Sequence, residues 1–211
     1  MKYKIGYIDE DKNQFIKYER ALRKYFDIIG YEIQQGLPID NLIKQVYESE
    51  VDLLMVDYLM NDKGILNYNG DEVARAYEEI MPRFPIIIFT NLETQAFPHV
   101  DNPNMIYDKE EVIKHPDHFV EKLVKTIELY KNFIKKRKDI LEKLIEKGER
   151  EGLNANEKHI LLETQIELNA LDKISNEVPL QLLDEKKMDN LSKTTKEAEE
   201  FLESLIKRNS K

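Results

Sequence analysis

The chain has 211 residues, of which 41% are hydrophobic and 35% are charged, and its formal net charge is −9. The absence of cysteine excludes disulfides, thiolate metal sites and a cysteine nucleophile. The negative charge argues against nucleic-acid binding, because that affinity depends on neutralising phosphates. No apolar run approaches the ~18–20 residues that cross a bilayer, and the first residues lack the pattern of a secretory signal. We therefore expect a cytoplasmic protein that binds neither nucleic acid nor membrane.

The first half of the chain alternates between short apolar runs and amphipathic segments. Apolar runs predict buried strands at residues 3–8, 52–57, 85–90 and 105–107, and a short strand is also expected at 31–34. Apolar positions three and four residues apart predict helices at 13–29, 39–49 and 71–81, with Asp40 able to cap the second. This alternation predicts an α/β fold: a flavodoxin-like, doubly wound, five-stranded parallel sheet with helices on both faces.

From Pro116 onward the apolar residues recur at alternating steps of three and four. The pattern predicts one helix from Asp117 to about Lys147, about 45 Å long, with Gly148 and Gly152 at its end. Such a heptad seam packs against another helix. Arg137, the one charged residue of this seam, either pairs with an acid on a neighbouring helix or is exposed. The seam consists of Val120, Leu123, Ile127, Tyr130, Ile134, Arg137, Leu141 and Leu144.

Two further helices are expected after this one. Asn154 and Glu157 have the spacing of a capping box, and Pro179 suits the first turn of a third helix. We therefore expect a sheet domain at residues 1–130 and an all-α coiled-coil hairpin or three-helix module at 131–211, continuous with the last helix of the sheet domain. Its seam could close within one chain or pair two chains into a homodimer. The stripes of the two helices are Leu161, Leu168, Leu171 and Ile174, and then Met188, Leu191, Thr195, Ala198, Leu202 and Leu205.

Polar side chains follow four of the predicted strands. Asp9 and Glu10 follow the first, Asp57 the strand at 52–57, Thr90 closes the next, and Lys109 comes soon after the last. Open parallel sheets bind ligands at the carboxyl ends of their strands. Clustered carboxylates favour a hard divalent cation such as Mg²⁺, while a lysine and a hydroxyl bind an anionic group. Together they describe a site that accepts a phosphoryl group on a carboxylate.

Four motifs stand in order on these strand ends: YIDED at residues 7–11, DLLMVDYLM at 52–60, IIIFTN at 86–91 and IYDK at 106–109. Together they resemble the receiver domain of two-component response regulators, over about residues 2–129. The resemblance implies that Asp57 is the phosphoacceptor. It also implies that the Thr90 hydroxyl and the Lys109 ammonium group contact the phosphoryl oxygens.

The same resemblance implies a Mg²⁺ site and a set of departures from the family pattern. The metal ligands would be Asp9, Glu10, Asp57 and the main-chain carbonyl of Leu59. Asn61 and Glu110 stand where the family usually has proline, and the loop at 62–69 is several residues longer than usual. Ile106 replaces an aromatic switch residue, and strand alternation points Tyr107 to the other face.

The resemblance implies a phosphorylation-controlled adaptor of a phosphorelay. A histidine kinase or phosphotransfer protein would phosphorylate Asp57, and the change would alter binding of an unidentified protein by the helical module. No enzymatic activity is expected beyond self-limited phosphoryl transfer. The alternatives are a pseudo-receiver that binds partners without phosphorylation, a helical module with its own phosphatase activity, and a DNA-binding regulator. The site acids could also be ordinary polar strand ends of a flavodoxin-like sheet.

Overall fold

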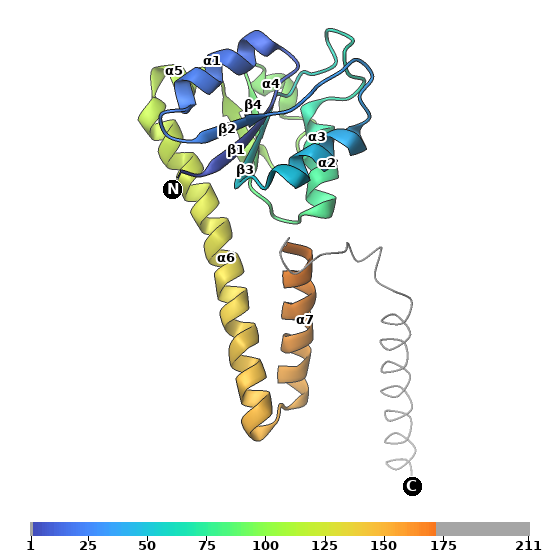
Figure 1. The fold of residues 1–211 in the computed structure, drawn as a ribbon, viewed down its shortest axis with the longest axis vertical. Coiled ribbons are helices and arrows are strands. Elements are labelled where there is room, and N and C mark those ends of the chain that lie inside the picture. Colours follow the sequence, from blue (N-terminus) through green and yellow to red (C-terminus); the bar gives the residue numbers. More distant parts are fainter. Residues whose placement is uncertain (1, 172–211) are drawn as a thin grey trace. The chain divides into compact units, whose positions relative to one another are not determined.

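The computed structural model describes residues 2–171. Five parallel strands form one sheet in the order β2-β1-β3-β4-β5 (Figure 1). This all-parallel order is the flavodoxin-like one, so the predicted fold class is confirmed. The strands are β1 (Lys4–Ile8), β2 (Asp27–Gly30), β3 (Leu53–Val56), β4 (Ile86–Thr90) and β5 (Ile106–Asp108).

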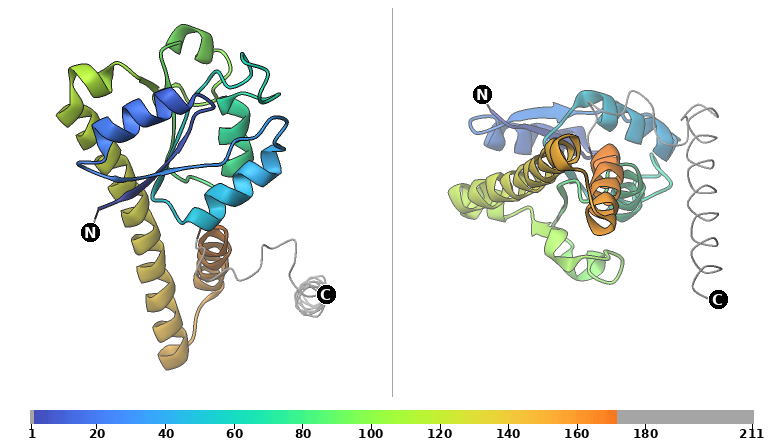
Figure 2. Two further views of the ribbon diagram at one scale, coloured as in Figure 1. Left: turned by 45° about the horizontal axis from the view of Figure 1, so that its top comes forward. Right: turned by 90° about the horizontal axis from the view of Figure 1, so that it is seen from below.

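Helices cover both faces of the sheet (Figure 2). On one face lie α1 (Lys12–Leu22), the short α5 (Glu111–Lys114) and the first part of α6 (Pro116–Glu151); on the other lie α2 (Ile39–Ser49), α3 (Gly70–Ile80) and the short α4 (Glu93–Ala96). A 3₁₀ turn, η1 (Pro103–Met105), precedes β5. The sequence pattern predicts no element at α4 or α5. It predicts a strand at 105–107, whereas Met105 belongs to η1 and β5 covers Ile106–Asp108.

The central strands divide the interior into two cores because their side chains alternate between faces. Every residue of β3 is buried. Leu54 and Val56 lie in the core under α2 and α3, whereas Leu53 and Met55 lie in the core under α1 and α6. Burial on both faces explains why this strand is a continuous apolar run rather than an alternating one.

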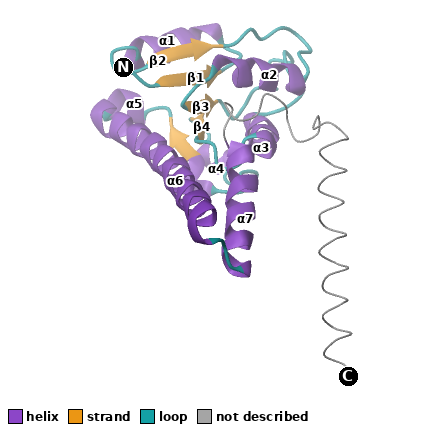
Figure 3. Cartoon of the chain, turned by 60° about the horizontal axis from the view of Figure 1, so that its bottom comes forward, coloured by secondary structure: helices purple, strands orange, loops and turns teal. Residues whose placement is uncertain are grey.

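Helix α6 continues past the sheet and is followed by α7 (Ala155–Leu171), which runs back beside it (Figure 3). The predicted capping box is present: the Asn154 amide donates to Glu157 Oε2 at 3.0 Å, and the Glu157 amide donates to Asn154 Oδ1 at 2.9 Å. Arg137 Nε lies 2.8 Å from Glu167 Oε2. Of the two alternatives for Arg137, pairing with an acid on a neighbouring helix is the one that the structure shows. Helices α6 and α7 form an antiparallel pair.

The middle of α6 contacts the amino edge of the sheet, where the strands begin. Lys131 Nζ lies 2.7 Å from Asp52 Oδ1, and the Tyr130 ring packs edge-on against Phe84, with 5.6 Å between ring centroids. The expected boundary between residues 130 and 131 therefore falls inside a continuous helix, at the point where that helix contacts the sheet.

Two predicted element boundaries in the first half are wrong. Helix α1 ends at Leu22, whose carbonyl accepts the amides of Tyr25 (2.8 Å) and Phe26 (3.0 Å). The chain then enters β2, which pairs with β1 from Lys4 opposite Asp27. Residues 27–30 are therefore a strand rather than the end of a helix, and residues 31–34 are not a strand.

Helix α2 has the predicted bounds but a different cap, and the long helix ends later than predicted. Pro38 is the N-cap of α2, and Asp40 lies within the first turn rather than capping it. Gly148 is inside α6, which ends at Glu151 and has Gly152 as its C-cap, where a φ of +80° suits glycine. Ile174 and the third helix predicted from Pro179 lie outside the described residues. Within residues 2–171, no helix is both long and apolar enough to span a membrane.

Candidate functional site

The register of the parallel sheet brings the carboxyl ends of four strands to one edge. Ile8 lies opposite Val56, and Thr90 lies opposite Asp108. The pairing continues beyond the strands, because the Asp57 amide donates to the Ile8 carbonyl at 2.9 Å and the Lys109 amide donates to the Thr90 carbonyl at 3.1 Å. These main-chain hydrogen bonds position the backbone of the residues whose side chains are predicted to meet.

Lys109 is the centre of the charge arrangement at this edge. Its Nζ donates to Asp9 Oδ2 at 2.9 Å and lies 3.1 Å from Asp57 Oδ1. The residue is only 4% exposed. Burial opposes its positive charge, but the Asp57 and Asp9 carboxylates outweigh burial and raise the pKa of Lys109. The lysine is thus a fixed, buried cation between two acids.

Asp9 is held by three donors. Besides Lys109, Oδ2 accepts the Tyr7 hydroxyl at 2.5 Å, and Oδ1 accepts the Asp11 amide at 2.9 Å. Burial and the neighbouring Asp9 charge raise the pKa of Tyr7, so its phenol remains a donor. The sequence analysis gave Tyr7 no role. Its position two residues before Asp9 in a strand was the available signal, since such residues share a face.

Glu10 supplies an unsatisfied anionic oxygen. Its side chain is 3% exposed, and its Oε2 is buried with no hydrogen-bond partner among the described residues. Burial raises the pKa of Glu10 above its ordinary value. A buried carboxylate oxygen without a donor is costly unless a cation contacts it. The residue therefore points to a cation as the missing partner.

The three acids fit a magnesium ion. One oxygen each from Asp9, Glu10 and Asp57 lies within 4.8 Å of the others. Carboxylate oxygens are the ligands of a hard divalent cation, and Mg²⁺ usually takes one or two carboxylates together with waters and phosphate oxygens. Leu59, whose main-chain carbonyl is the further metal ligand that the resemblance implies, lines the same pocket.

Asp57 is perturbed by its surroundings. Burial raises its pKa to about 7, the Lys109 charge opposes that rise, and the Asp9 charge adds to it. In the metal-free protein the carboxyl group is therefore partly protonated at neutral pH. A bound divalent cation would favour its ionised form, which is the form that acts as a nucleophile.

Thr90 and a glycine complete the surroundings of Asp57. Thr90 is 1% exposed, lines the pocket, and accepts the Leu92 amide on Oγ1 at 3.0 Å. Gly70 packs directly behind Asp57: a Cβ at this position would lie 2.1 Å from the Asp57 carbonyl oxygen. Only glycine fits this contact without displacing the backbone of Asp57, a constraint that the sequence analysis did not identify.

The five predicted side chains therefore meet at one pocket. Its remaining lining comes mostly from the loop after β3 and the loop after β4. The lining residues are Asp9, Glu10, Asp11, Gln14, Asp57, Leu59, Asp62, Lys63, Thr90, Asn91, Leu92 and Lys109.

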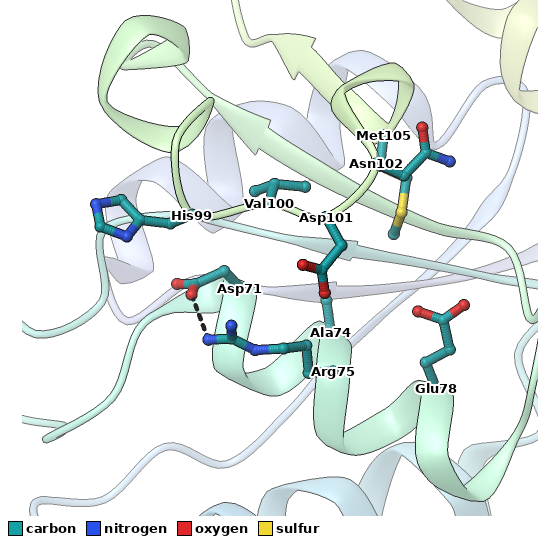
Figure 4. A pocket seen from close by; sticks show the side chains of 9 residues that line it. All are labelled: Asp71, Ala74, Arg75, Glu78, His99, Val100, Asp101, Asn102 and Met105. Atoms are coloured by element: carbon teal, nitrogen blue, oxygen red, sulfur yellow. Dashed lines mark hydrogen bonds and ion pairs between the residues drawn. The ribbon is translucent and has the colours of Figure 1, made fainter.

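A second pocket lies between α3 and the segment before β5 (Figure 4). Asp71, at the start of α3, is bound by Arg75 at 2.7 Å, so this buried acid is already neutralised by its own helix. Figure 4 shows Glu78 and Asp101 projecting into the space from the two sides. None of the residues predicted from the strand ends lines this pocket.

Strand β5 places its two apolar residues as expected. Ile106 packs on the core under α2 and α3, whereas the Tyr107 ring meets Phe119 of α6 edge-on, with 5.9 Å between centroids. Tyr107 therefore lies on the opposite face from Ile106, as strand alternation predicts.

Solved structures of receiver domains are among the proteins to which this chain is similar, as its motifs predicted. The beryllofluoride-activated receiver domain of DrrB has 20% identity and a TM-score of 0.43, covering 61% of this chain and 99% of that chain. A receiver protein from Sinorhizobium medicae has 18% identity and a TM-score of 0.45, covering 60% and 97%. A chain from the complex of histidine kinase ThkA with response regulator TrrA has 19% identity and a TM-score of 0.43, covering 58% and 98%. No family model matches the chain, and no curated protein matches it.

Proposed function

We propose that this chain is the receiver of a two-component phosphorelay, and that it accepts a phosphoryl group on Asp57. The observation that carries the proposal is the position of Lys109 Nζ, 2.9 Å from Asp9 and 3.1 Å from Asp57, beside a buried and unpaired Glu10 oxygen. Three acids around one lysine repel one another, which is electrostatically unfavourable. A divalent cation would offset this repulsion, and the lysine and the cation together would then bind an anionic phosphoryl group.

The transfer itself requires little from the protein besides positioning and charge neutralisation. A carboxylate oxygen of Asp57 forms a bond to phosphorus, and the bond from phosphorus to the donor breaks. The donor atom leaves with the electron pair; it is a histidine nitrogen in a kinase, or an acetate oxygen in acetyl phosphate. Lys109 then neutralises part of the negative charge of the new acyl phosphate.

Thr90 and the metal ligands complete the proposed chemistry. The Thr90 oxygen accepts the Leu92 amide, so its own hydroxyl proton is available for a phosphoryl oxygen. Asp9, Glu10, Asp57 and the Leu59 carbonyl would hold Mg²⁺, which supplies charge neutralisation to the phosphoryl oxygens. In this proposal the protein carries out only its own phosphoryl transfer and is otherwise not an enzyme.

The proposed output is altered protein binding by the helical part of the chain. The first part of helix α6 contacts α5, which follows Lys109 closely in the chain: Lys122 pairs with Glu111 of α5 at 2.9 Å. Helix α6 then continues unbroken into the antiparallel pair with α7. A change at the site can therefore reach α7 without crossing a flexible linker. A histidine kinase or phosphotransfer protein is the proposed donor, and the downstream partner is a protein bound by this helical part or a second copy of the chain. The cytoplasmic location stays a prediction.

Incubation with acetyl phosphate and Mg²⁺, followed by intact mass measurement, tests the proposal. Wild type is expected to gain one phosphoryl group, Asp57→Asn none, and chelation of Mg²⁺ should prevent labelling. Asp62→Asn is the matched control, because Asp62 lines the same pocket but has no proposed role. Equal labelling of wild type and Asp57→Asn would exclude this acceptor. A wild-type protein that is not labelled by acetyl phosphate and does not bind beryllofluoride would indicate a pseudo-receiver.

A further inference from the structure

The loop between β3 and α3 brings a second lysine to the site. A turn at residues 61–64 is closed by the Gly64 amide, which donates to the Asn61 carbonyl at 3.2 Å. Gly64 has a φ of +64°, a conformation that favours glycine. The turn directs Lys63 toward the end of β1.

The loop is anchored on both sides of this turn. The Asn69 side chain accepts the Met60 and Asn61 amides at 3.2 and 3.3 Å, and the Ile65 carbonyl accepts the Gly36 amide at 2.8 Å. These bonds tie the loop to the start of α3 and to the loop after β2. The position of Lys63 is therefore supported by the main chain rather than by its ion pairs alone.

Lys63 contacts the acids from the solvent side. Its Nζ lies 2.7 Å from Asp11 Oδ2 and 3.5 Å from Glu10 Oε1. The Lys63 side chain is 43% exposed, whereas that of Glu10 is 3% exposed. The Lys63 ammonium group thus contacts Glu10, a buried acid that the proposed function assigns to the metal. It forms its shorter ion pair with Asp11.

We propose that Lys63 is a tethered cation that competes with Mg²⁺ for Glu10 and so sets the metal affinity of the site. The inference rests on the proposed function, because it uses the same acid cluster. A divalent ion at Glu10 would be repelled by the nearby ammonium group. Asp11 gives Lys63 an alternative partner, so the lysine can release Glu10 without becoming unpaired.

This competition would link metal occupancy to phosphorylation. Before transfer, Lys63 and Lys109 already neutralise part of the acid cluster, which weakens its attraction for a further cation. After transfer, the phosphoryl group adds negative charge, which can hold Mg²⁺ and both lysines together. The site would then bind Mg²⁺ more tightly in the phosphorylated protein than in the free one.

The affinity for Mg²⁺, measured by calorimetric titration at fixed ionic strength, tests the inference. Lys63→Met is expected to bind Mg²⁺ about three- to tenfold more tightly than wild type, because one nearby positive charge is lost. Lys63→Arg keeps the charge and should bind like wild type. Lys44→Met is the matched control: it removes the same charge from a lysine paired with Glu48 on α2, and it should also bind like wild type.

Each other result contradicts one of the two proposals. Equal or weaker Mg²⁺ binding by Lys63→Met overturns competition by Lys63 and leaves the proposed metal site intact. Tighter binding by both Lys63→Met and Lys44→Met shows a general charge effect and also overturns it. If neither wild type nor Lys63→Met binds Mg²⁺, the metal site of the proposed function itself is wrong.

Discussion

At the carboxyl edge of the sheet, one buried lysine faces three acids, whereas at the amino edge a half-exposed lysine faces one. Lys109 lies between Asp9 and Asp57 with Glu10 close by. Lys131 pairs with Asp52, whose other oxygen accepts the Lys4 amide at 2.8 Å. The Lys131–Asp52 pair is balanced in charge, and both Asp52 oxygens have a partner. At the carboxyl edge three acids surround one buried lysine, and Glu10 Oε2 has no hydrogen-bond partner among the described residues.

The contrast separates a docking contact from a ligand site. Around Lys131 the contacts are complementary and aromatic: Tyr130 packs on Phe84, and the Arg83 guanidinium lies 4.9 Å from the centre of the Phe133 ring. Such contacts attach α6 to the sheet at little cost. At the other edge, burial raises the pKa values of Asp57 and Glu10, which means that the ionised forms of both carboxyl groups are destabilised there. That instability is expected where a cation and an anion are to bind.

Replacing the lysine at each edge gives the largest expected difference in the free energy of unfolding. Lys109→Met leaves two buried acids without their cation, so we expect the free energy of unfolding to fall by about 3 kcal/mol at pH 8 without Mg²⁺. Lys131→Met removes a half-exposed pair and should cost less than about 1 kcal/mol. Urea denaturation measures both, and similar losses would mean that the two edges do not differ as described.

A methyl group behind Asp57 should be nearly as disruptive. Gly70→Ala places a Cβ 2.1 Å from the Asp57 carbonyl oxygen, so we expect a loss of about 2–3 kcal/mol in unfolding free energy and loss of labelling by acetyl phosphate. Gly148→Ala is the control within α6, where the nearest atom is the flexible Leu153 side chain at 3.3 Å, and it should change stability by less than about 1 kcal/mol. A normally labelled Gly70→Ala protein would show that this contact does not position the acceptor.

The raised pKa of Asp57 predicts a pH-dependent effect of neutralising it. In the folded chain its pKa is about 7, against an ordinary value of 3.8, so the folded state binds this proton more tightly. The stabilisation from this carboxyl group is fully present below about pH 4 and is lost as the pH rises through 7. Without Mg²⁺, Asp57→Asn should therefore exceed wild type in unfolding free energy by roughly 1–3 kcal/mol at pH 8. The difference should shrink toward pH 4.

Asp52→Asn is the counterpart at the amino edge. It weakens the contacts with Lys131 and the Lys4 amide and should lower stability by about 1 kcal/mol at pH 8. If Asp57→Asn and Asp52→Asn both stabilise the protein, or if neither does, the claim that only the carboxyl edge destabilises its carboxylates is wrong.

The smallest expected effect concerns the pair between α6 and α7. A double-mutant cycle on Arg137 and Glu167, which lie 2.8 Å apart, should give a coupling of about 0.5 kcal/mol that decreases with salt. The pair is partly exposed, so it belongs with the docking contacts. A coupling of several kcal/mol would place it with the buried charges instead.

Much of the fold could be predicted because the central strands are apolar on both faces. Residues 53–56 and 85–90 are buried runs, and parallel strands bring their carboxyl ends together, so Asp57, Thr90 and Lys109 could be expected to meet. Strand β2 could not be found in this way. The apolar residues of β2 happen to continue the spacing of α1, and only pairing with β1 separates the two elements.

The contacts that the sequence did not reveal depend on loop geometry and close packing. Lys63 reaches Glu10 because of one turn in the long loop between β3 and α3. Gly70 matters through a backbone contact that no spacing rule describes. Tyr7 is different, since strand alternation already placed its hydroxyl on the same side as Asp9.

Chemical mapping of the acyl phosphate tests the central claim most directly. Borohydride reduces an aspartyl phosphate to homoserine, which peptide mass spectrometry locates within the chain. After treatment with acetyl phosphate and Mg²⁺, we predict this product at Asp57, and its absence when Mg²⁺ is chelated. Reduction at Asp9, at Asp62 or at no aspartate in a protein that binds Mg²⁺ would contradict the account.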